Sequence, residues 1–274
     1  MSNPNRPIAF VLAASNHGSL IVNRHDYRMV DATRGYGVGF QILNNSCFDP
    51  DEIRFAMALL DSRRKYFGDG VFAIDGGANI GVHTIEWSRH MHGWGRVLAF
   101  EAQELVYYAL AGNIALNNCL NARARLAALG AACGELDIPQ PNYLAPASFG
   151  SLELRQSGGN EFIGQQISYA SQDCTRVSMV SLDSLDAARL DLIKIDVEGM
   201  ELEVLQGGRE MLSKLRPLMI VEAIKTDRAA LEALLLGLDY RVFPLGINLL
   251  AVHATDPTLQ HITHSASGIN FATV

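Results

Sequence analysis

Short hydrophobic runs alternate with segments of helical periodicity along most of the chain. The runs are continuous, which predicts strands buried on both faces, as in a parallel sheet flanked by helices. Strands are expected at residues 71–74, 97–100, 125–129, 190–195 and 218–221. Helices are expected at residues 49–67, 82–90, 105–117, 200–215 and 228–236. This order predicts an α/β fold with a doubly wound, mostly parallel sheet and helices on both faces.

Local signals mark both ends of this pattern. Asp49 is placed to cap the first helix, and Glu52 three residues later completes a capping box. After the last helix, hydrophobic runs at 240–243 and 247–252 are separated by a proline and a glycine. This spacing predicts a C-terminal antiparallel hairpin at one edge of the sheet.

Two stretches fall outside the pattern and set the domain organisation. Residues 1–48 are expected to form an N-terminal extension of strands or a lid, with a short strand or packing segment at 8–14, before one main domain at 49–274. Between about 134 and 172, prolines and glycines break the periodicity and predict an insertion. If its ends follow the carboxyl ends of strands, it lies on the side where open sheets place their ligand crevice. Two roles are open for it, a loop that shapes a substrate pocket and a plain surface excursion.

Composition narrows the class of protein. Hydrophobic residues make up 49% of the chain and charged residues 19%, which is typical of a globular domain with a large core. The net charge of −7 argues against nucleic acid as a partner, and no apolar run is long enough to span a membrane. The four cysteines form no CxxC pair, which favours reduced, buried thiols in a cytoplasmic protein over a zinc site or disulfides.

The strongest local motif is a glycine-rich turn after the strand at 71–74. Asp75 closes the strand and is followed by the turn Gly76–Gly81, which predicts a cofactor site. The turn resembles the dinucleotide fingerprint except for Ala78, but Asp75 would place a carboxylate beside a diphosphate, which is unfavourable. S-adenosylmethionine (SAM) carries an ammonium and a sulfonium instead, so the acidic strand end favours SAM over a nicotinamide dinucleotide.

A second acidic residue, Glu101, ends the next strand. A carboxylate there can accept hydrogen bonds from both ribose hydroxyls of an adenosine. Within the turn, Asn79 is expected either to hold the turn or to contact the amino-acid part of the cofactor. His83, just inside the following helix, is expected to be a packing residue. The cofactor-binding residues predicted on these grounds and on the resemblance below are Asp75, Gly76, Gly77, Asn79, Gly81, Glu101 and Ala102.

A second acidic cluster follows the strand at 190–195. Asp196, Glu198 and Glu201 lie within six residues, and Glu222 ends the next strand at the same predicted crevice. These side chains are suited to accepting a proton from a substrate, binding the cofactor ammonium or coordinating a cation. For Asp196 with Glu222, hydrogen bonds from backbone amides are favoured over a metal, so no metal ligand is assigned. Glu201 is equally suited to stabilising the first turn of its helix.

These motifs together resemble the FkbM family of SAM-dependent methyltransferases. The resemblance covers residues 71–253, and its markers are DGGANIG at 75–81, FEA at 100–102 and IDVEGMELEVLQGG at 195–208. The family usually has a valine at the position of Gly76 and a proline at that of Ala102. Neither difference removes a polar contact.

The resemblance implies a seven-stranded, Rossmann-like class I methyltransferase sheet, SAM as cofactor and O-methylation of a sugar, polyketide or similar metabolite. Asp75, Gly77, Asn79, Gly81 and Glu101 match the family's cofactor positions, and Asp196, Glu198 and Glu201 match its DVEGxE acids. The expected reaction is in-line displacement, with Asp196 or Glu198 as proton acceptor and Glu222 as the third candidate.

Other functions remain open at this stage. A nicotinamide-dependent dehydrogenase and a catalytically silent binding subunit with a methyltransferase fold are the alternatives. A divalent metal ion is a less favoured addition to SAM. The expected partner is a small-molecule or glycan hydroxyl substrate, with no nucleic acid and no membrane, and the chain is compatible with a homo-oligomer.

Overall fold

The computed structural model describes residues 7–265 and 268–272, so residues 1–6 of the predicted extension lie outside it. The chain divides into two compact units. The smaller unit combines Met1–Phe48 with Asp137–Thr175, and the larger unit combines Asp49–Leu136 with Arg176–Val274. Each unit is therefore built from two separate stretches of sequence. The stretches predicted as an N-terminal extension and as an insertion fall almost entirely in the smaller unit.

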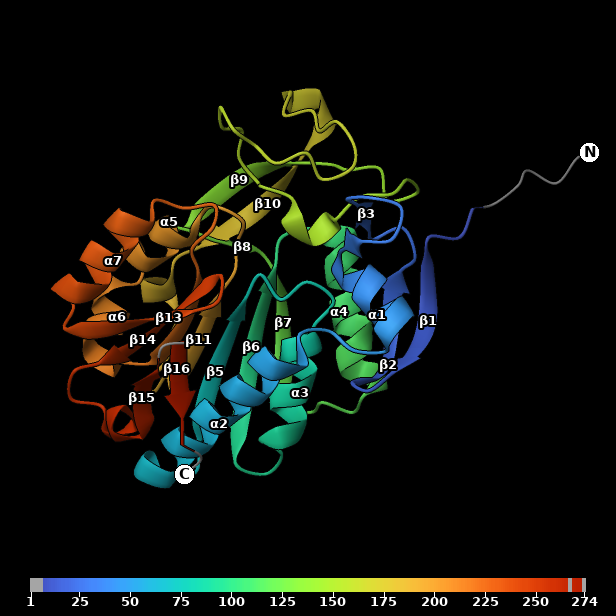
Figure 1. Cartoon of the computed structure of the whole chain (residues 1–274). Coiled ribbons are helices and arrows are strands. Elements are labelled where there is room, and N and C mark those ends of the chain that lie inside the picture. The colour runs from blue at the N-terminus through green and yellow to red at the C-terminus, as the bar shows by residue number, and fades with distance from the viewer. Residues whose placement is uncertain (1–6, 266–267, 273–274) are drawn as a thin grey trace, which may run out of the picture. The chain divides into compact units, whose positions relative to one another are not determined.

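The larger unit is built on a seven-stranded sheet with the order β13-β14-β12-β11-β5-β6-β7 (Figure 1). The pairs β11–β12, β11–β5, β5–β6 and β6–β7 are parallel, and β14 runs antiparallel to both of its neighbours. The predicted mostly parallel, seven-stranded sheet is confirmed. Its strands are β5 (Val71–Gly76), β6 (Gly95–Glu101), β7 (Ala122–Leu126), β11 (Leu192–Ile195), β12 (Leu218–Glu222), β13 (Tyr240–Leu245) and β14 (Asn248–His253).

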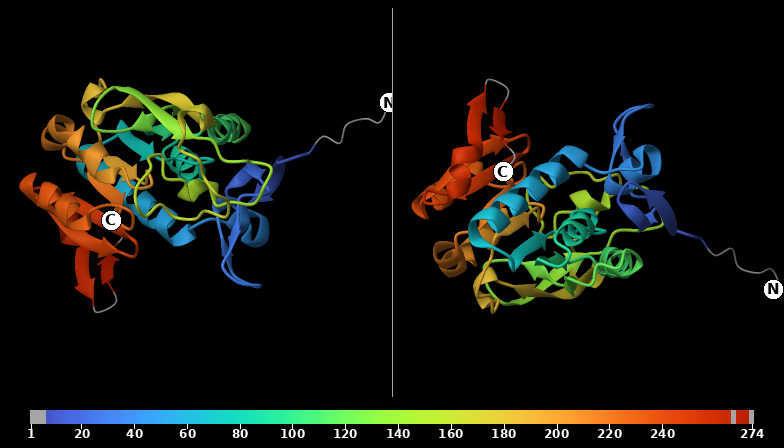
Figure 2. Two further views of the ribbon diagram at one scale, coloured as in Figure 1. Left: turned by 90° about the horizontal axis from the view of Figure 1, so that it is seen from above. Right: turned by 90° about the horizontal axis from the view of Figure 1, so that it is seen from below.

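The central strands form where the sequence is continuously hydrophobic. Every residue of β5, β11 and β12 is buried, as expected for strands covered on both faces. Helices cover the sheet on both sides (Figure 2). Helix α3 contacts α2 and α4, and α5 contacts α6 and α7. The helices are α2 (Pro50–Phe67), α3 (Val82–His90), α4 (Glu104–Leu116), α5 (Glu201–Gln206), α6 (Arg209–Leu215) and α7 (Arg228–Gly237).

The predicted C-terminal hairpin is present as β13–β14. A further antiparallel pair follows, β15 (Ile262–Ser265) with β16 (Gly268–Phe271), after the short helix η4 (Pro257–His261). The weak strand predicted at 125–129 is divided between β7 and β8 (Ala128–Leu129), and β8 pairs in parallel with β10 (Cys174–Val180) instead of joining the large sheet. The short helix η3 (Leu182–Ser184) follows β10.

The single helix predicted at 200–215 is wrong, because the chain breaks it into α5 and α6 at Gly207 and Gly208. A Cβ on Gly207 would lie 2.3 Å from the carbonyl oxygen of Gly130, and one on Gly208 would lie 2.8 Å from Leu182 Cδ1. The two glycines therefore allow a close approach of neighbouring chain that a continuous helix with side chains would prevent.

The smaller unit joins its two stretches through buried polar contacts. Asp26 accepts hydrogen bonds from the N–H of Gly39 at 2.8 Å and of Phe149 at 3.0 Å, and Asn23 donates to the carbonyl of Tyr143 at 3.0 Å. Its elements are β1 (Phe10–Ser15), β2 (Gly18–Asn23), β3 (Arg28–Met29), β4 (Gly35–Tyr36), α1 (Val38–Asn45), η1 (Phe149–Ser151) and η2 (Ser171–Asp173). Strand β9 (Gly134–Pro139) spans the boundary between the units. The strand predicted near 8–14 corresponds to β1.

Candidate active site

The acidic residues singled out in the sequence meet at one edge of the large sheet. The parallel register places Asp75 beside Lys194, Gly76 beside Ile195 and Ile195 beside Val221. The carboxyl ends of β5, β6, β11 and β12 therefore lie side by side. This edge is where open α/β sheets bind ligands.

The backbone N–H groups of the glycine turn are already hydrogen-bonded to acceptors in the protein. The N–H groups of Gly77 and Ala78 both donate to the carbonyl of Phe100, at 3.1 and 2.9 Å, and Gly81 N–H donates to Ala78 at 2.9 Å. Asn79 N–H donates to Glu101 Oε2 at 2.9 Å, and Ile80 N–H donates to Asn79 Oδ1 at 2.7 Å. Every N–H from residue 77 to 81 thus has a partner within the protein. A diphosphate, which requires such donors, finds none in this turn.

Close packing explains why several positions of the turn are glycine. Gly77 has a φ of 79°, and a Cβ there would lie 1.7 Å from the carbonyl oxygen of Asp196. Gly81 has a φ of 90°, and its Cβ would lie 2.5 Å from Leu110 Cδ1. A Cβ on Gly76 would meet Leu129 Cδ1 at 2.8 Å. The turn is tightly held against the sheet whatever ligand it faces.

Asp75 and Glu101 are buried at the predicted cofactor position. Asp75 is 1% exposed and accepts a hydrogen bond from Thr84 Oγ1 at 2.6 Å. Glu101 accepts from the N–H of Gln103 at 2.8 Å as well as from Asn79. Burial raises the pKa of Glu101 to about 7, against the lowering effect of these backbone donors. Each carboxylate oxygen of Glu101 keeps a second lone pair, so the side chain still fits the ribose role.

Asn79 holds the turn, which is one of the two roles expected for it. Its φ of 50° is left-handed, a conformation that asparagine tolerates better than most residues, and its Oδ1 binds the next N–H. Ala102, beside Glu101, is buried. Whether Asn79 and Ala102 also contact a cofactor stays a prediction.

Three acids come together opposite the turn and form what we term the acid cluster: Asp196, Glu198 and Glu222. One carboxylate oxygen of each lies within 4.8 Å of the others. Asp196 accepts from Lys194 Nζ at 2.6 Å, and Glu198 accepts from Lys225 Nζ at 2.6 Å. Glu222 differs, because its buried Oε2 has no hydrogen-bond partner among the residues that the structure describes.

The cluster is electrostatically strained. Burial, followed by the charges of Asp196 and Glu201, raises the pKa of Glu222 to about 8. Burial and the charge of Asp196 likewise raise the pKa of Glu198 well above its ordinary range, although Lys225 opposes this. Glu198 also has a positive φ of 54°. Such backbone strain concentrates at functional sites.

Glu201 supports the loop that carries these acids. Its Oε1 accepts from the N–H of Val197 at 3.0 Å and from that of Gly199 at 3.1 Å, and the residue is fully buried. The side chain therefore fixes the backbone on both sides of Glu198. A positioning role suits it better than direct chemistry.

Sequence reasoning missed Lys194, a charged residue in a fully buried strand. It is 5% exposed. Burial alone would lower its pKa, but the carboxylates of Asp196, Glu52 and Asp75 outweigh this effect and raise the pKa above its ordinary value. The signal was present in the sequence, because a lysine inside an apolar strand needs partners.

The predicted capping box at the start of α2 is wrong. Asp49 makes no side-chain cap hydrogen bond, and Glu52 turns toward the sheet edge. There it accepts from Asn248 Nδ2 at 2.6 Å and lies 3.1 Å from His83 Nε2. Burial alone would raise the pKa of Glu52. These contacts and the charge of Lys194 outweigh burial and lower the pKa to about 2. His83 is buried, and its ring packs edge-on against Trp87, as expected for a packing histidine.

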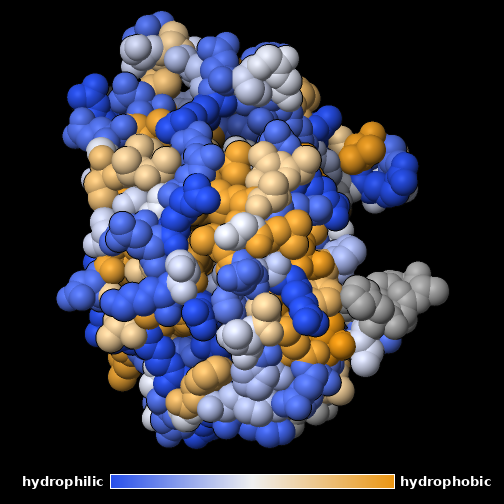
Figure 3. Space-filling model, turned by 90° about the vertical axis from the view of Figure 1, so that its left-hand side faces the viewer, coloured by the Kyte–Doolittle hydropathy of each residue, from blue (hydrophilic) through white to orange (hydrophobic). Residues whose placement is uncertain are grey.

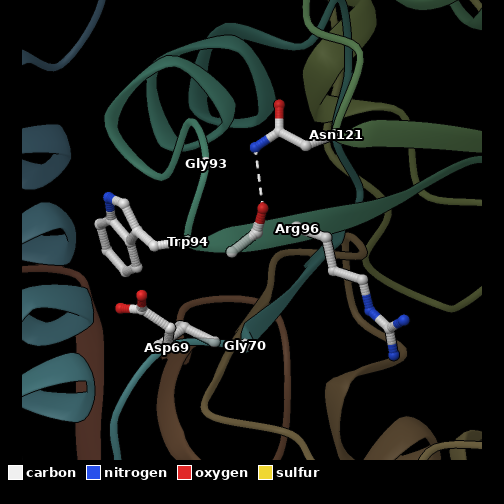
Figure 4. A pocket seen from close by; sticks show the side chains of 8 residues that line it. Asp69, Gly70, Gly93, Trp94, Arg96 and Asn121 are labelled. Atoms are coloured by element: carbon white, nitrogen blue, oxygen red, sulfur yellow. Dashed lines mark hydrogen bonds between the residues drawn. The ribbon is translucent and has the colours of Figure 1, made fainter.

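A surface pocket lies at the opposite edge of the sheet. It is lined by the residues that begin β5 and β6 and by Asn121, which donates to the carbonyl of Gly95 at 2.9 Å (Figure 4). These are the amino ends of the strands, away from the acid cluster. The pocket is therefore separate from the candidate active site.

The four cysteines, all in the described part of the chain, are free, but the expectation that they are buried is correct only for Cys119. Among the described residues, no helix combines the length and hydrophobicity that crossing a membrane requires.

Comparison with known proteins identifies the family. The model of the methyltransferase FkbM domain matches residues 75–242. Methyltransferase sdnD of Sordaria araneosa is 28% identical over 246 residues, covering 82% of this chain and 89% of that protein. Methyltransferase 1 of Beauveria bassiana (strain ARSEF 2860) is 28% identical over 149 residues, covering 52% of this chain and 59% of that protein.

The solved structures that resemble this chain include an FkbM methyltransferase from Methylobacillus flagellatus KT. It has 17% identity and a TM-score of 0.48, and the match covers 78% of this chain and 58% of that one. The family model spans both the glycine turn and the acid cluster, which join in one site at the carboxyl edge of the sheet. The chain belongs to the FkbM methyltransferase domain family.

Proposed function

We propose that this methyltransferase transfers the methyl group of SAM to a hydroxyl oxygen of a small metabolite at the carboxyl edge of the large sheet. The observation that carries the proposal is the pairing of an acidic turn, whose backbone donors are all in use, with a neighbouring carboxylate oxygen, Glu222 Oε2, that has no hydrogen-bond partner in the described part of the chain. The first feature suits a cationic cofactor. The second supplies a proton acceptor.

The turn fits SAM better than a nicotinamide dinucleotide. Asp75 and Glu101 place two buried carboxylates where an ammonium, a sulfonium and ribose hydroxyls would lie. All five N–H groups from 77 to 81 are bound within the protein, so a diphosphate would find no free donor in the turn itself and would face two acids. These facts argue against the dehydrogenase alternative.

The reaction is a direct displacement. The acceptor hydroxyl oxygen forms a bond to the methyl carbon while the carbon–sulfur bond breaks, and its electron pair stays on sulfur to leave S-adenosylhomocysteine. The protein contributes alignment, worth ~7–11 kcal/mol in the best-oriented reactions. The hydroxyl proton passes to the acid cluster.

Glu222 is the preferred proton acceptor within this cluster. Asp196 and Glu198 each bind a lysine ammonium through one oxygen, whereas Glu222 Oε2 has no hydrogen-bond partner among the described residues. Burial and the neighbouring acids raise the pKa of Glu222 to about 8, a value near neutral pH that suits a proton acceptor. This reverses the order expected from the sequence, in which Glu222 stood third.

The surroundings of the site favour an acceptor with an apolar portion. Ile224 and Ile247 flank the end of β12 and are 57% and 58% exposed, and Ala223 N–H donates to the carbonyl of Ile247 at 3.2 Å. Hydrophobic side chains also reach the surface beside hydrophilic ones on the side of the molecule that carries α7 (Figure 3). A polyketide or a glycosylated apolar metabolite would match this pairing of acids and large apolar side chains.

The proposal is tested by incubating the protein with methyl-labelled SAM and fractionated small metabolites, followed by mass spectrometry. The expected product carries the label on an oxygen and is accompanied by S-adenosylhomocysteine. Label on carbon or nitrogen would contradict the O-methylation proposal. Tight SAM binding without transfer to any fraction would instead favour the silent binding subunit.

The affinity for SAM is expected to fall as the pH drops below about 7. Burial raises the pKa of Glu101 to about 7, so the side chain is mostly ionised at pH 8 and mostly protonated at pH 6. The ionised form accepts more hydrogen bonds and attracts a cation. If binding requires that form, the Kd should rise by up to about tenfold per pH unit below this value. Calorimetric titrations between pH 5.5 and 8 measure the effect.

The control for this pH dependence is Glu101→Gln, which has no charge to lose. It should bind SAM more weakly at pH 8, and its Kd should change little between pH 8 and 6. If the wild-type Kd does not change across this range, SAM binding does not require ionised Glu101. The same slope in the variant would assign the titration to another group.

A further inference from the structure

We propose that Asp196, Glu198 and Glu222 bind a single hard divalent cation, Mg²⁺, Mn²⁺ or Ca²⁺, which in turn holds an oxygen of the methyl acceptor. The proposal deepens the function proposed above and rests on it for the role of the ion. The ion-binding site itself rests on the described residues alone.

The three carboxylates are arranged as a set of ligands. One oxygen of each lies within 4.8 Å of the others. Three oxygens spread evenly around a Ca²⁺ ion at ~2.3–2.6 Å lie about 4.0–4.5 Å from one another, so a small closing of the cluster would bring all three to bonding distance. The shorter ~2.0–2.1 Å bonds of Mg²⁺ place the oxygens about 3.5 Å apart and require a larger closing.

Two lysines orient two of the ligand residues, and each lysine binds only one of the two carboxylate oxygens. Lys194 binds Asp196 through Oδ2, and Lys225 binds Glu198 through Oε2. No described donor hydrogen-bonds to Asp196 Oδ1 or Glu198 Oε1. Each residue therefore keeps an oxygen for an ion, while its other oxygen is fixed by an ammonium. Outer partners of this kind commonly orient metal ligands.

An independent observation comes from Glu222, which is 6% exposed and whose Oε2 has no hydrogen-bond partner among the described residues. The sequence left two explanations open for this residue, backbone amides or a cation. Within residues 7–265 and 268–272, no amide donates to this oxygen. A buried carboxylate oxygen without a partner is costly, and a cation bound to it would remove that cost.

Charge and ligand chemistry point to the same class of ion. The three carboxylates and two lysines sum to −1 when all are ionised, and the carboxylates of Glu201, Glu52 and Asp75 lie near them as well. A divalent cation would offset part of this negative charge. The ligand set contains only carboxylate oxygens, without histidine or cysteine, which favours a hard cation over zinc.

An ion in this position would serve methyl transfer by fixing the acceptor. Three protein oxygens leave coordination positions for water or for substrate oxygens. A hydroxyl bound there is aligned for attack and gives up its proton more easily. The ion would take Glu222 Oε2, and the hydroxyl proton would then pass to the other carboxylate oxygen of Glu222 instead of to Oε2.

The test is a titration of metal-free protein with Mn²⁺ at pH 8. The electron paramagnetic resonance signal of free Mn²⁺ measures how much of the ion is bound. The wild-type chain should bind one equivalent, and Mg²⁺ or Ca²⁺ should compete for it. Glu222→Gln and Glu198→Gln should each weaken binding at least about tenfold, since each removes a charged ligand. The matched control Glu232→Gln, on α7 and paired with Arg228, should bind like the wild type. Circular dichroism melting curves establish that each variant is folded.

The absence of a saturable site up to about 1 mM Mn²⁺, the weak end for oxygen-ligand sites, would overturn the proposal. Unchanged binding in both cluster variants, or an equal loss in Glu232→Gln, would also overturn it. SAM calorimetry on the same samples separates the two hypotheses. If SAM binds but Mn²⁺ does not, only the proposed cation site is refuted. If Mn²⁺ binds but SAM does not, the proposed methyl donor site is refuted.

Discussion

Replacing Glu222 by glutamine is expected to lower kcat by about 10²- to 10⁴-fold, the usual contribution of a general base. The substitution keeps the size of the side chain but removes its charge and its capacity to accept the hydroxyl proton. The Kd for SAM should stay close to that of the wild type, because Asp75 and Glu101 provide the predicted cofactor contacts. Steady-state kinetics and calorimetry on the same sample measure the two effects separately.

The control for this prediction is Glu232→Gln on the surface of α7. Its partner Arg228 is exposed, so losing the ion pair should change stability by less than about 1 kcal/mol and leave kcat unaltered. Wild-type turnover in Glu222→Gln would remove this residue from the chemistry. A loss of SAM binding equal to the loss of kcat would instead place it in the cofactor site.

Replacing Gly77 by alanine is expected to reduce the free energy of unfolding by roughly 4 kcal/mol or more, among the largest effects of a point substitution. The added Cβ would lie 1.7 Å from the carbonyl oxygen of Asp196, and the φ of 79° is itself unfavourable for alanine. Because the obstacle is backbone that carries an acid of the cluster, relief would displace Asp196. Urea denaturation measures the loss of stability.

Gly93 offers a matched control for this substitution. Its φ is 81°, close to that of Gly77, but a Cβ there meets nothing within 4 Å. Gly93→Ala should therefore cost only the backbone strain, about 1–2 kcal/mol. Equal losses in the two variants would show that the close approach to Asp196 has no energetic weight.

The sheet and the acidic edge were predictable because their signals are local. Residues 82–90 form α3 as expected, and the apolar runs before Glu101 and Glu222 form strands that end at these acids. The run before Asp75 forms a strand that ends one residue after it, at Gly76. Parallel strands place their carboxyl ends together. The meeting of the acids at one edge therefore followed from the order of elements alone.

Contacts between distant segments were not predictable in the same way. Glu52 matched a local capping pattern, yet it bonds to Asn248, 196 residues away. Which of two compatible partners a side chain takes depends on tertiary packing that a single sequence does not reveal. For the same reason, the lysine partners of Asp196 and Glu198 were not predictable. Nor was the lack of a hydrogen-bond partner for Glu222 Oε2 among the described residues.

The smaller unit illustrates a further limit. Residues 1–48 and the region after 134 carry no shared motif, but Asp26 binds N–H groups from both stretches, at Gly39 and Phe149. A buried aspartate joining segments 123 residues apart leaves no periodic signal in the sequence. The composition of the two stretches indicated loops and strands without indicating that they form one unit.

The acidic turn should bind a cationic sulfonium cofactor and not a dinucleotide, and calorimetry with SAM and with NAD measures this preference. One SAM should bind per chain, and NAD should not bind. Glu101→Gln should weaken SAM binding by about 10- to 100-fold, the value of hydrogen bonds to a charged group. Stronger binding of NAD than of SAM, or SAM affinity that is unchanged in Glu101→Gln, would rule out a cationic cofactor at this turn.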